Sequence, residues 1–355
     1  MNRFASRSLF IRWSIAVLAV LSITSVTQAE INLERAPGRD FNHNKARTLV
    51  FPSWFKQSFW YLNDDINDAI KSGKIGIMID ASEESCTYCI AFVERSLNNP
   101  EIQKRFRKNF DALGLEVIGD TEIHDVDGKA YSVKNFLKKY KAYVTPTLLF
   151  FGKDGKLLLK VTGYYSPEKF TQVLDYFESG QYQEKSWRDY YTARNDTGGA
   201  GIVYDTALFR TDVGNLARNK SIAKRPLMVL FEKPGCEDCK RLHDKVLSAQ
   251  TTRNWIKQFD AAQISADDDK AVLVTPGGKK TTAKAWAGAL NLVYYPAFVF
   301  FDESGNEVFR IDTYTRNVRL EGSMSLVLNK GYLDEPQLQR WNRARFVRRM
   351  EEQQK

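Results

Sequence analysis

The sequence predicts an α/β protein in which a mixed central sheet flanked by helices occurs twice in tandem, after an N-terminal export signal. One observation is that a Cys-x-x-Cys pair follows a short apolar run at Cys86 and again at Cys236. The other is a repeat with a spacing of 150 residues. It relates Cys86 to Cys236, Gly128 to Gly278, Pro146 to Pro296 and Gly155 to Gly305.

Residues 1–29 have the pattern of a cleavable secretory signal peptide. Three arginines precede an apolar run at 13–26, and no acidic residue occurs before Glu30. A membrane-spanning helix needs about 20 apolar residues, so we expect no stable membrane insertion and treat an uncleaved anchor as the alternative. Removal of the signal peptide takes away three arginines and lowers the formal net charge of +9 by three. The mild positive charge that remains is weak evidence for any kind of partner.

The first unit is expected to begin with a helix over residues 53–73, capped by Ser53 and ended by Gly73, because its apolar residues recur at helical spacing. Residues 75–80 form a short apolar strand, and helical spacing resumes from Cys86 to Leu97. The later elements follow from turn residues and apolar runs: helix 100–106, strand 112–118, a turn at Asp127-Gly128 inside an inserted loop, helix 133–140, strands 147–151 and 156–161 as a hairpin, and helix 167–177.

The predicted division of the chain is a signal peptide (1–29), an N-terminal arm (30–50), the first domain (51–182), a helical tail and linker (183–204), the second domain (205–333) and a basic helical tail (334–355). Residues 195–201 are rich in glycine and polar residues, which favours a flexible joint there. In the last segment, Trp341 and Phe346 lie among arginines. We interpret it as a solvated terminal helix and expect no nucleic-acid partner.

The Cys-x-x-Cys pair of the first unit is expected to be a redox site. A thiolate at Cys86 would be stabilised by the free N–H groups and positive dipole of the helix start. Cys89, one turn further on, can attack a mixed disulfide between Cys86 and a substrate, which releases the reduced substrate and leaves a Cys86-Cys89 disulfide. All four cysteines of the chain belong to the two pairs, so none remains for a structural disulfide.

This order of elements, with Cys-x-x-Cys at a strand-to-helix turn and Thr145-Pro146 before a hairpin strand, resembles the thioredoxin fold. The resemblance implies a cis proline at Pro146 that lies against the cysteines, with the preceding backbone at Thr145 pairing with substrate. It also implies a buried acid six residues before the first cysteine, where Asp80 stands, acting as a general base for Cys89. The alternative is that Asp80 merely ends a strand.

The second site, built on Cys236, Cys239 and Pro296, departs from this pattern. Leu230 replaces the acid, and Tyr295 replaces Thr145. Glu232 lies nearer the cysteines and is a possible substitute, although its offset does not match. The acidic dipeptide between the cysteines, Glu237-Asp238, disfavours a thiolate, while Lys233, Lys240 and Arg241 oppose that effect.

Other kinds of site fit less well. The two cysteine pairs are separated by 146 residues, far more than in a zinc site built from such pairs. The histidines His43, His124 and His243 are too scattered for a metal cluster. His243 follows Cys239 by four and either tunes that thiol or is an ordinary surface histidine. No phosphate-binding glycine loop or dinucleotide fingerprint occurs, so we expect neither metal nor cofactor beyond the disulfides themselves.

More closely, the run at 53–56, Cys-Thr-Tyr-Cys at 86–89, Gly-Tyr-Tyr-Ser-Pro-Glu at 163–168 and Phe-Glu-Lys-Pro-Gly-Cys at 231–236 resemble exported thioredoxin-related proteins of the SoxW type. This resemblance implies a periplasmic reductase of protein disulfides, fed by a membrane thiol reductant of the DsbD or CcdA kind. The second domain would be a relay or a modified partner. A disulfide isomerase is one alternative, and a binding or assembly adaptor without turnover is another.

Overall fold

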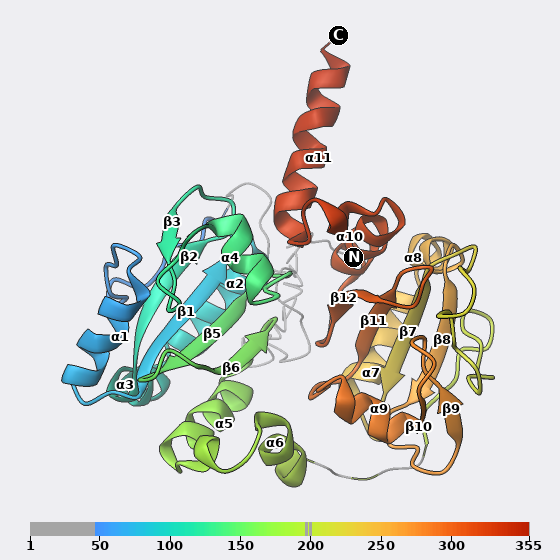
Figure 1. The fold of residues 1–355 in the computed structure, drawn as a ribbon, viewed down its shortest axis with the longest axis horizontal. Coiled ribbons are helices and arrows are strands. Elements are labelled where there is room, and N and C mark those ends of the chain that lie inside the picture. Colours follow the sequence, from blue (N-terminus) through green and yellow to red (C-terminus); the bar gives the residue numbers. More distant parts are fainter. Residues whose placement is uncertain (1–46, 196–197, 199–200, 355) are drawn as a thin grey trace, which may run out of the picture.

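The computed structural model describes residues 47–195, 198 and 201–354. The predicted signal peptide, most of the predicted arm and most of the predicted joint lie outside the described residues. Within them, two copies of one α/β arrangement follow each other and lie side by side (Figure 1). The predicted tandem fold is confirmed.

The first domain is a four-stranded mixed sheet of order β2-β1-β5-β6. β1 pairs in parallel with β2 and antiparallel with β5, and β5 pairs antiparallel with β6. Its strands are β1 (Gly76–Ser82), β2 (Phe110–Glu116), β5 (Thr147–Gly152) and β6 (Leu157–Thr162), with a small hairpin of β3 (Glu122–His124) and β4 (Ala130–Ser132). Its helices are α1 (Leu62–Lys71), α2 (Thr87–Phe92) with its π-helical continuation η1 (Val93–Leu97), α3 (Pro100–Asn109), α4 (Val133–Lys139), α5 (Pro167–Glu178), the 3-10 turn η2 (Gln181–Gln183) and α6 (Trp187–Asn195).

The second domain has the same sheet, in the order β12-β11-β7-β8, with the same strand directions. Its strands are β7 (Leu227–Glu232), β8 (Asp260–Ser265), β11 (Ala297–Phe301) and β12 (Glu307–Ile311), with the hairpin of β9 (Val272–Val274) and β10 (Lys280–Thr282). Its helices are α7 (Glu237–Leu242) with the π-helical η3 (His243–Leu247), α8 (Gln250–Ile256), α9 (Ala283–Ala289), α10 (Asn317–Leu328), the 3-10 turn η4 (Gly331–Leu333) and α11 (Leu338–Gln353).

The predicted helix at 53–73 is correct only in its second half, because α1 begins at Leu62. Trp60 has a positive φ of 62°, which no helix accommodates, and its carbonyl oxygen accepts a hydrogen bond from the backbone N–H of His124. Ser53 therefore caps no helix. Phe55 is nevertheless buried in the core, whereas Phe59 is 92% exposed.

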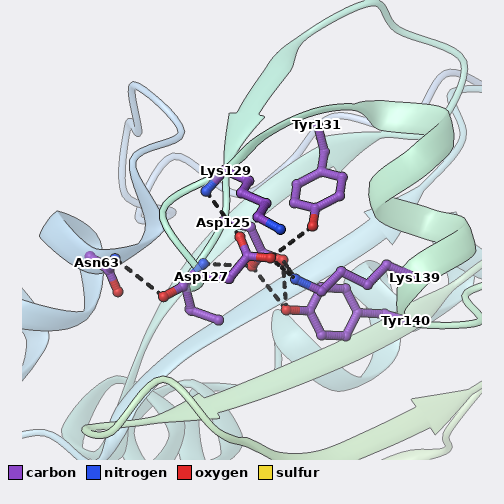
Figure 2. Close-up of polar contacts among 8 residues, drawn as sticks. Asn63, Asp125, Asp127, Lys129, Tyr131, Lys139 and Tyr140 are labelled. Atoms are coloured by element: carbon purple, nitrogen blue, oxygen red, sulfur yellow. Dashed lines mark hydrogen bonds and ion pairs between the residues drawn. The ribbon is translucent and has the colours of Figure 1, made fainter.

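The inserted loop of the first domain turns at Asp127-Gly128 as predicted, and a cluster of polar side chains holds it (Figure 2). The buried carboxylate of Asp125 accepts hydrogen bonds from Lys139 and from the hydroxyl of Tyr140, both at the end of α4. Asp127 accepts hydrogen bonds from Tyr131 and Lys139. The hairpin is thereby fixed to the helix that follows it.

Each domain packs the segment that precedes its cis proline against the other domain. Val144 of the first domain packs in the core cluster of α10 and α11, which belong to the second domain. Tyr294, its counterpart 150 residues on, packs in the core cluster of α5 and α6 in the first domain and lies 5.0 Å from Tyr165, ring centre to ring centre. The contact is thus nearly twofold symmetric, with Gly163 and its counterpart Thr313 touching each other where the two halves meet.

Candidate redox sites

The sulfur atoms of the first site lie at the start of α2, as predicted. Cys86 is the N-cap residue, and its Sγ accepts a hydrogen bond of 3.1 Å from the backbone N–H of Cys89, with which it forms a disulfide. The hydroxyl of Thr145 donates a second hydrogen bond of 3.3 Å to the same sulfur. The peptide bond between Thr145 and Pro146 is cis. The structure therefore brings together the two cysteines and the Thr-Pro step that the sequence singled out.

Asp80 lies in the middle of β1 with no exposed surface. Burial raises the pKa of its carboxyl to about 7, and the hydrogen bond of 2.5 Å from the Ser82 hydroxyl to Oδ1 opposes that rise. Its other oxygen, Oδ2, has no hydrogen-bond partner among the described residues. A carboxyl in this state can take up or release a proton near neutral pH, which is what the proposed base for Cys89 requires.

The first site is covered. Cys86 is only 7% exposed, and Leu49 and Tyr164 pack against the cysteine pair. From the second domain, Arg319 of α10 places its guanidinium 4.1 Å from the ring centre of Tyr88, which directly precedes Cys89 on α2. Its Nη2 donates a hydrogen bond of 2.6 Å to the carbonyl oxygen of Thr145.

The second site has the same backbone geometry but is more open. Cys236 caps α7, and its Sγ accepts a hydrogen bond of 3.1 Å from the backbone N–H of Cys239, its disulfide partner. The peptide bond before Pro296 is also cis, and the carbonyl oxygen of Tyr295 lies 3.5 Å from the Cys236 sulfur. Cys236 is partly exposed and borders a cavity of about 160 Å³.

The charges at the second site are paired. Asp238 lies 3.1 Å from Arg241 on its own helix and 3.3 Å from Lys169 of the first domain. Lys169, on α5, is the counterpart of Arg319, on α10. Each domain therefore places one cation against the Cys-x-x-Cys segment of the other domain. Glu232 is buried and accepts one hydrogen bond from Gln263, while His243 Nε2 lies 3.1 Å from both of its oxygens. The negative charge predicted beside Cys236 is therefore partly compensated.

Arg319 and Lys169 are not among the site residues predicted from the sequence. Their signal is nevertheless present in the repeat, because a basic residue occupies the same place in the helix after each hairpin. Glu232 and His243 are singled out by the sequence, but only the structure shows that they are in contact. The described residues contain no group of three or more His, Cys, Asp or Glu side chains suited to a metal ion. Over the same part of the chain, no helix combines the length and apolarity needed to cross a bilayer.

Comparison with solved structures gave thioredoxin-fold proteins, and three of them each cover between 33% and 39% of this chain. A thioredoxin-fold protein from Helicobacter pylori is 16% identical, with 39% of this chain and 88% of that chain covered and a TM-score of 0.33. The C-terminal domain of DsbD from Neisseria meningitidis is 18% identical, with 33% and 92% covered and a TM-score of 0.26. The DsbH oxidoreductase is 12% identical, with 38% and 98% covered and a TM-score of 0.26.

A comparison with curated protein sequences gave no match. The model of the thioredoxin-like domain family, however, matches the chain twice, over residues 62–178 and 216–327. Each match contains one Cys-x-x-Cys disulfide and one cis proline, and together they cover more than half of the chain. The protein thus belongs to the thioredoxin-like domain family and contains that domain in two tandem copies.

Proposed function

We propose that the protein is an exported, periplasmic thiol-disulfide oxidoreductase that reduces disulfides of other exported proteins through Cys86 and Cys89. The observation that carries this proposal is the pair of donors on the Cys86 sulfur, the N–H of Cys89 and the hydroxyl of Thr145. Both donors favour the thiolate over the thiol once the disulfide is reduced. Export rests on the pattern of residues 1–29, and the periplasm on the resemblance to SoxW-type proteins.

In the proposed reaction, the Cys86 thiolate attacks a substrate disulfide and forms a mixed disulfide, while the first substrate sulfur leaves as a thiolate. Cys89 then loses its proton to Asp80 and attacks the Cys86 sulfur. The second substrate sulfur leaves, and the Cys86-Cys89 disulfide remains. Asp80 suits the step because its pKa of about 7 lies where a carboxyl can exchange a proton under physiological conditions.

The second domain is proposed to relay electrons to the first. Cys236 is partly exposed and Cys86 is covered, so a reductant of the DsbD or CcdA kind can reach Cys236 in the arrangement seen here. The reduced Cys236 would then attack the Cys86-Cys89 disulfide and pass the electron pair on, with Cys239 closing the second disulfide. A protein substrate reaches Cys86 only when Arg319 leaves Thr145. Reduction is preferred to isomerisation because the resemblance to SoxW-type proteins implies a reductase.

Insulin reduction with a chemical reductant tests the chemistry in the full mature chain. We expect Cys86→Ala to abolish activity and Cys236→Ala to leave activity driven by the chemical reductant largely intact. Full activity of both variants would refute a Cys-x-x-Cys mechanism and leave the adaptor function. Rescue of a scrambled disulfide protein at a rate above that of simple reduction would favour the isomerase.

A trapping variant identifies the substrate class. In Cys89→Ala the mixed disulfide on Cys86 has no resolving thiol, so a substrate protein stays covalently bound. Cys239→Ala serves as the matched variant for the second site. After Cys236 attacks the Cys86-Cys89 disulfide, this variant has no resolving thiol, so it is expected to hold an internal Cys236-Cys86 disulfide instead of a bound substrate. Recovery of the same proteins by both variants would contradict a relay with a fixed direction.

A further inference from the structure

The second domain keeps a buried acid, displaced by two residues along the strand. Side chains two residues apart on a strand share a face, and the hydrogen bond between Ser82 and Asp80 shows that they meet on β1. On β7 the counterparts are Glu232 and Leu230. The second domain thus has its carboxylate in the place of Ser82, about 7 Å nearer the cysteine end of the strand.

Glu232 has an imidazole partner on the cysteine-bearing helix. His243 Nε2 lies 3.1 Å from each oxygen of Glu232, and Glu232 is 1% exposed. The backbone N–H of His243 bonds to the carbonyl oxygen of Cys239, so the two residues lie one helical turn apart on one face. A helical side chain leans toward the turn that precedes it, and for His243 that turn carries Cys239. In the first domain the counterpart of His243 is Val93, which cannot carry a proton.

We propose that His243 is the proton acceptor for Cys239 at the second site. Glu232 positions the imidazole and stabilises its protonated form. This inference rests on the proposed thiol-disulfide exchange at Cys236 and Cys239. Nε2–H donates to Glu232, which leaves Nδ1 to accept a proton. When a partner is bound to Cys236 as a mixed disulfide, the thiol of Cys239 gives its proton to neutral His243. The Cys239 thiolate attacks the Cys236 sulfur, the Cys236-Cys239 bond forms, and the partner leaves with the electron pair as a thiolate.

The surrounding charges suit this role. The hydrogen bond with Glu232 raises the pKa of His243, burial opposes the rise, and Asp205 and Asp244 add to it. Asp205 is itself paired with Arg253 at 3.1 Å. Gln263, from β8, donates to Glu232 and to the carbonyl oxygen of Val203, which fixes the carboxylate in place. A fixed carboxylate holds the imidazole in one tautomer.

The test uses the full mature chain with Cys86 and Cys89 both replaced by alanine, so that only the second site reacts. Reduced protein is mixed with the aromatic disulfide dithiobis(nitrobenzoate), and release of thionitrobenzoate is followed by absorbance across a range of pH. The first phase reports attack by Cys236, and the second phase reports resolution by Cys239. The variant Cys239→Ala identifies the second phase by its loss.

We expect the rate of the second phase to rise with pH through the pKa of His243. In Glu232→Gln and in His243→Val, that rise should move toward the ordinary cysteine pKa of about 8.5, with roughly a tenfold or greater loss at neutral pH. The double variant Leu230→Asp with Glu232→Ser, which copies the first domain, should restore part of the rate. His124→Val, far from either cysteine pair in sequence and ion-paired with Glu122 in the β3–β4 hairpin, is the control for loss of an imidazole.

An unchanged pH profile of the second phase in both Glu232→Gln and His243→Val would overturn the inference, provided circular dichroism shows both variants folded. If one of the two variants fails to fold, the pH profiles of the other variant and of the double variant decide whether the inference holds. Absence of a second phase in the parent protein would overturn the inference together with exchange at the second site, while insulin reduction through Cys86 would remain a separate result.

Discussion

The guanidinium of Arg319 donates a hydrogen bond of 2.6 Å to the carbonyl oxygen of Thr145, the residue before the cis proline of the other domain. Arg319 is buried and has no carboxylate partner among the described residues. Burial lowers the pKa of its guanidinium, and the nearby Tyr88 opposes that effect. One side chain of the second domain thus contacts both Thr145 and Tyr88, which lie beside the cysteine pair of the first.

Replacement of Arg319 by alanine is expected to speed reduction of the Cys86-Cys89 disulfide. A hydrogen bond to a charged group contributes about 1.5 kcal/mol or more, so we expect roughly a tenfold faster reaction. Quenched alkylation followed by peptide mass analysis measures the reduction of each disulfide separately. The matched variant Lys169→Ala should act on the Cys236-Cys239 disulfide instead. Equal rates for Arg319→Ala and the unmodified protein would show that α10 does not limit access.

Asp80→Leu is expected to remove a pH dependence of stability. The pKa of about 7 in the folded protein lies above the value of about 3.9 for an unfolded chain, so folding favours the protonated carboxyl. Its stabilising effect is complete below the unfolded value and is lost as pH rises through 7. The unmodified protein should therefore lose on the order of 4 kcal/mol from this group between acidic and mildly alkaline pH.

Urea unfolding of the unmodified protein and of Asp80→Leu at about pH 5 and about pH 8 measures about 3 kcal/mol of this loss, because only the two pH units between 5 and 7 contribute in that interval. Leucine is the residue that the second domain carries at the same place, Leu230. Asp120→Leu, at an exposed position, controls for the addition of an apolar side chain. If the variant loses as much stability with rising pH as the unmodified protein does, Asp80 is not the group responsible.

Thr145→Val should raise the pKa of the Cys86 thiol by about one unit, because it removes a hydroxyl donor from the sulfur while keeping the shape of the side chain. Ultraviolet absorbance of the thiolate, followed against pH in the Cys89→Ala background, measures the shift. The reciprocal change Tyr295→Thr supplies a hydroxyl at the second site and should lower the pKa of Cys236. A Thr145→Val variant with unchanged titration would contradict the proposed stabilisation of the thiolate.

Tyr294→Ala is expected to weaken the contact between the domains. The ring packs among Tyr165 and Tyr191 of the first domain, at 5.0 and 4.6 Å between ring centres. Loss of a buried aromatic ring costs about 3 kcal/mol, and here the loss falls on the interface. Thermal unfolding should then separate into two transitions. Tyr204→Ala, at a residue 46% exposed, is the control, and a single unshifted transition in Tyr294→Ala would argue against coupling of the domains.

Local patterns were sufficient to predict the strands of the first domain's main sheet, the cysteine-bearing helices and the repeat, because each follows from apolar spacing and turn residues in its own segment. The short strands β3 and β4 were not predicted, since their segment was interpreted as a loop. The first half of the helix at 53–73 was predicted wrongly, because the pairing of Trp60 with His124 outweighs its helical spacing. The contact of Arg319 with Thr145 and Tyr88 depends on how two domains pack, and no local pattern encodes that. The contact of Glu232 with His243 was within reach, since strand alternation and helical spacing place both residues on facing surfaces.

Val144 and Tyr294 each pack into the core of the other domain. This gives the single chain the kind of interface that a dimer of identical subunits would have. In such a dimer any substitution appears in both subunits at once. The two sites must therefore keep the same buried acid, the same solvent access and the same reduction potential. Fusion in one chain removes that restriction. Asp80 can differ from Leu230, Thr145 from Tyr295 and Arg319 from Lys169, while the packing that joins the halves is kept. The proposed flow of electrons needs two unlike sites held together, and the joined chain provides them.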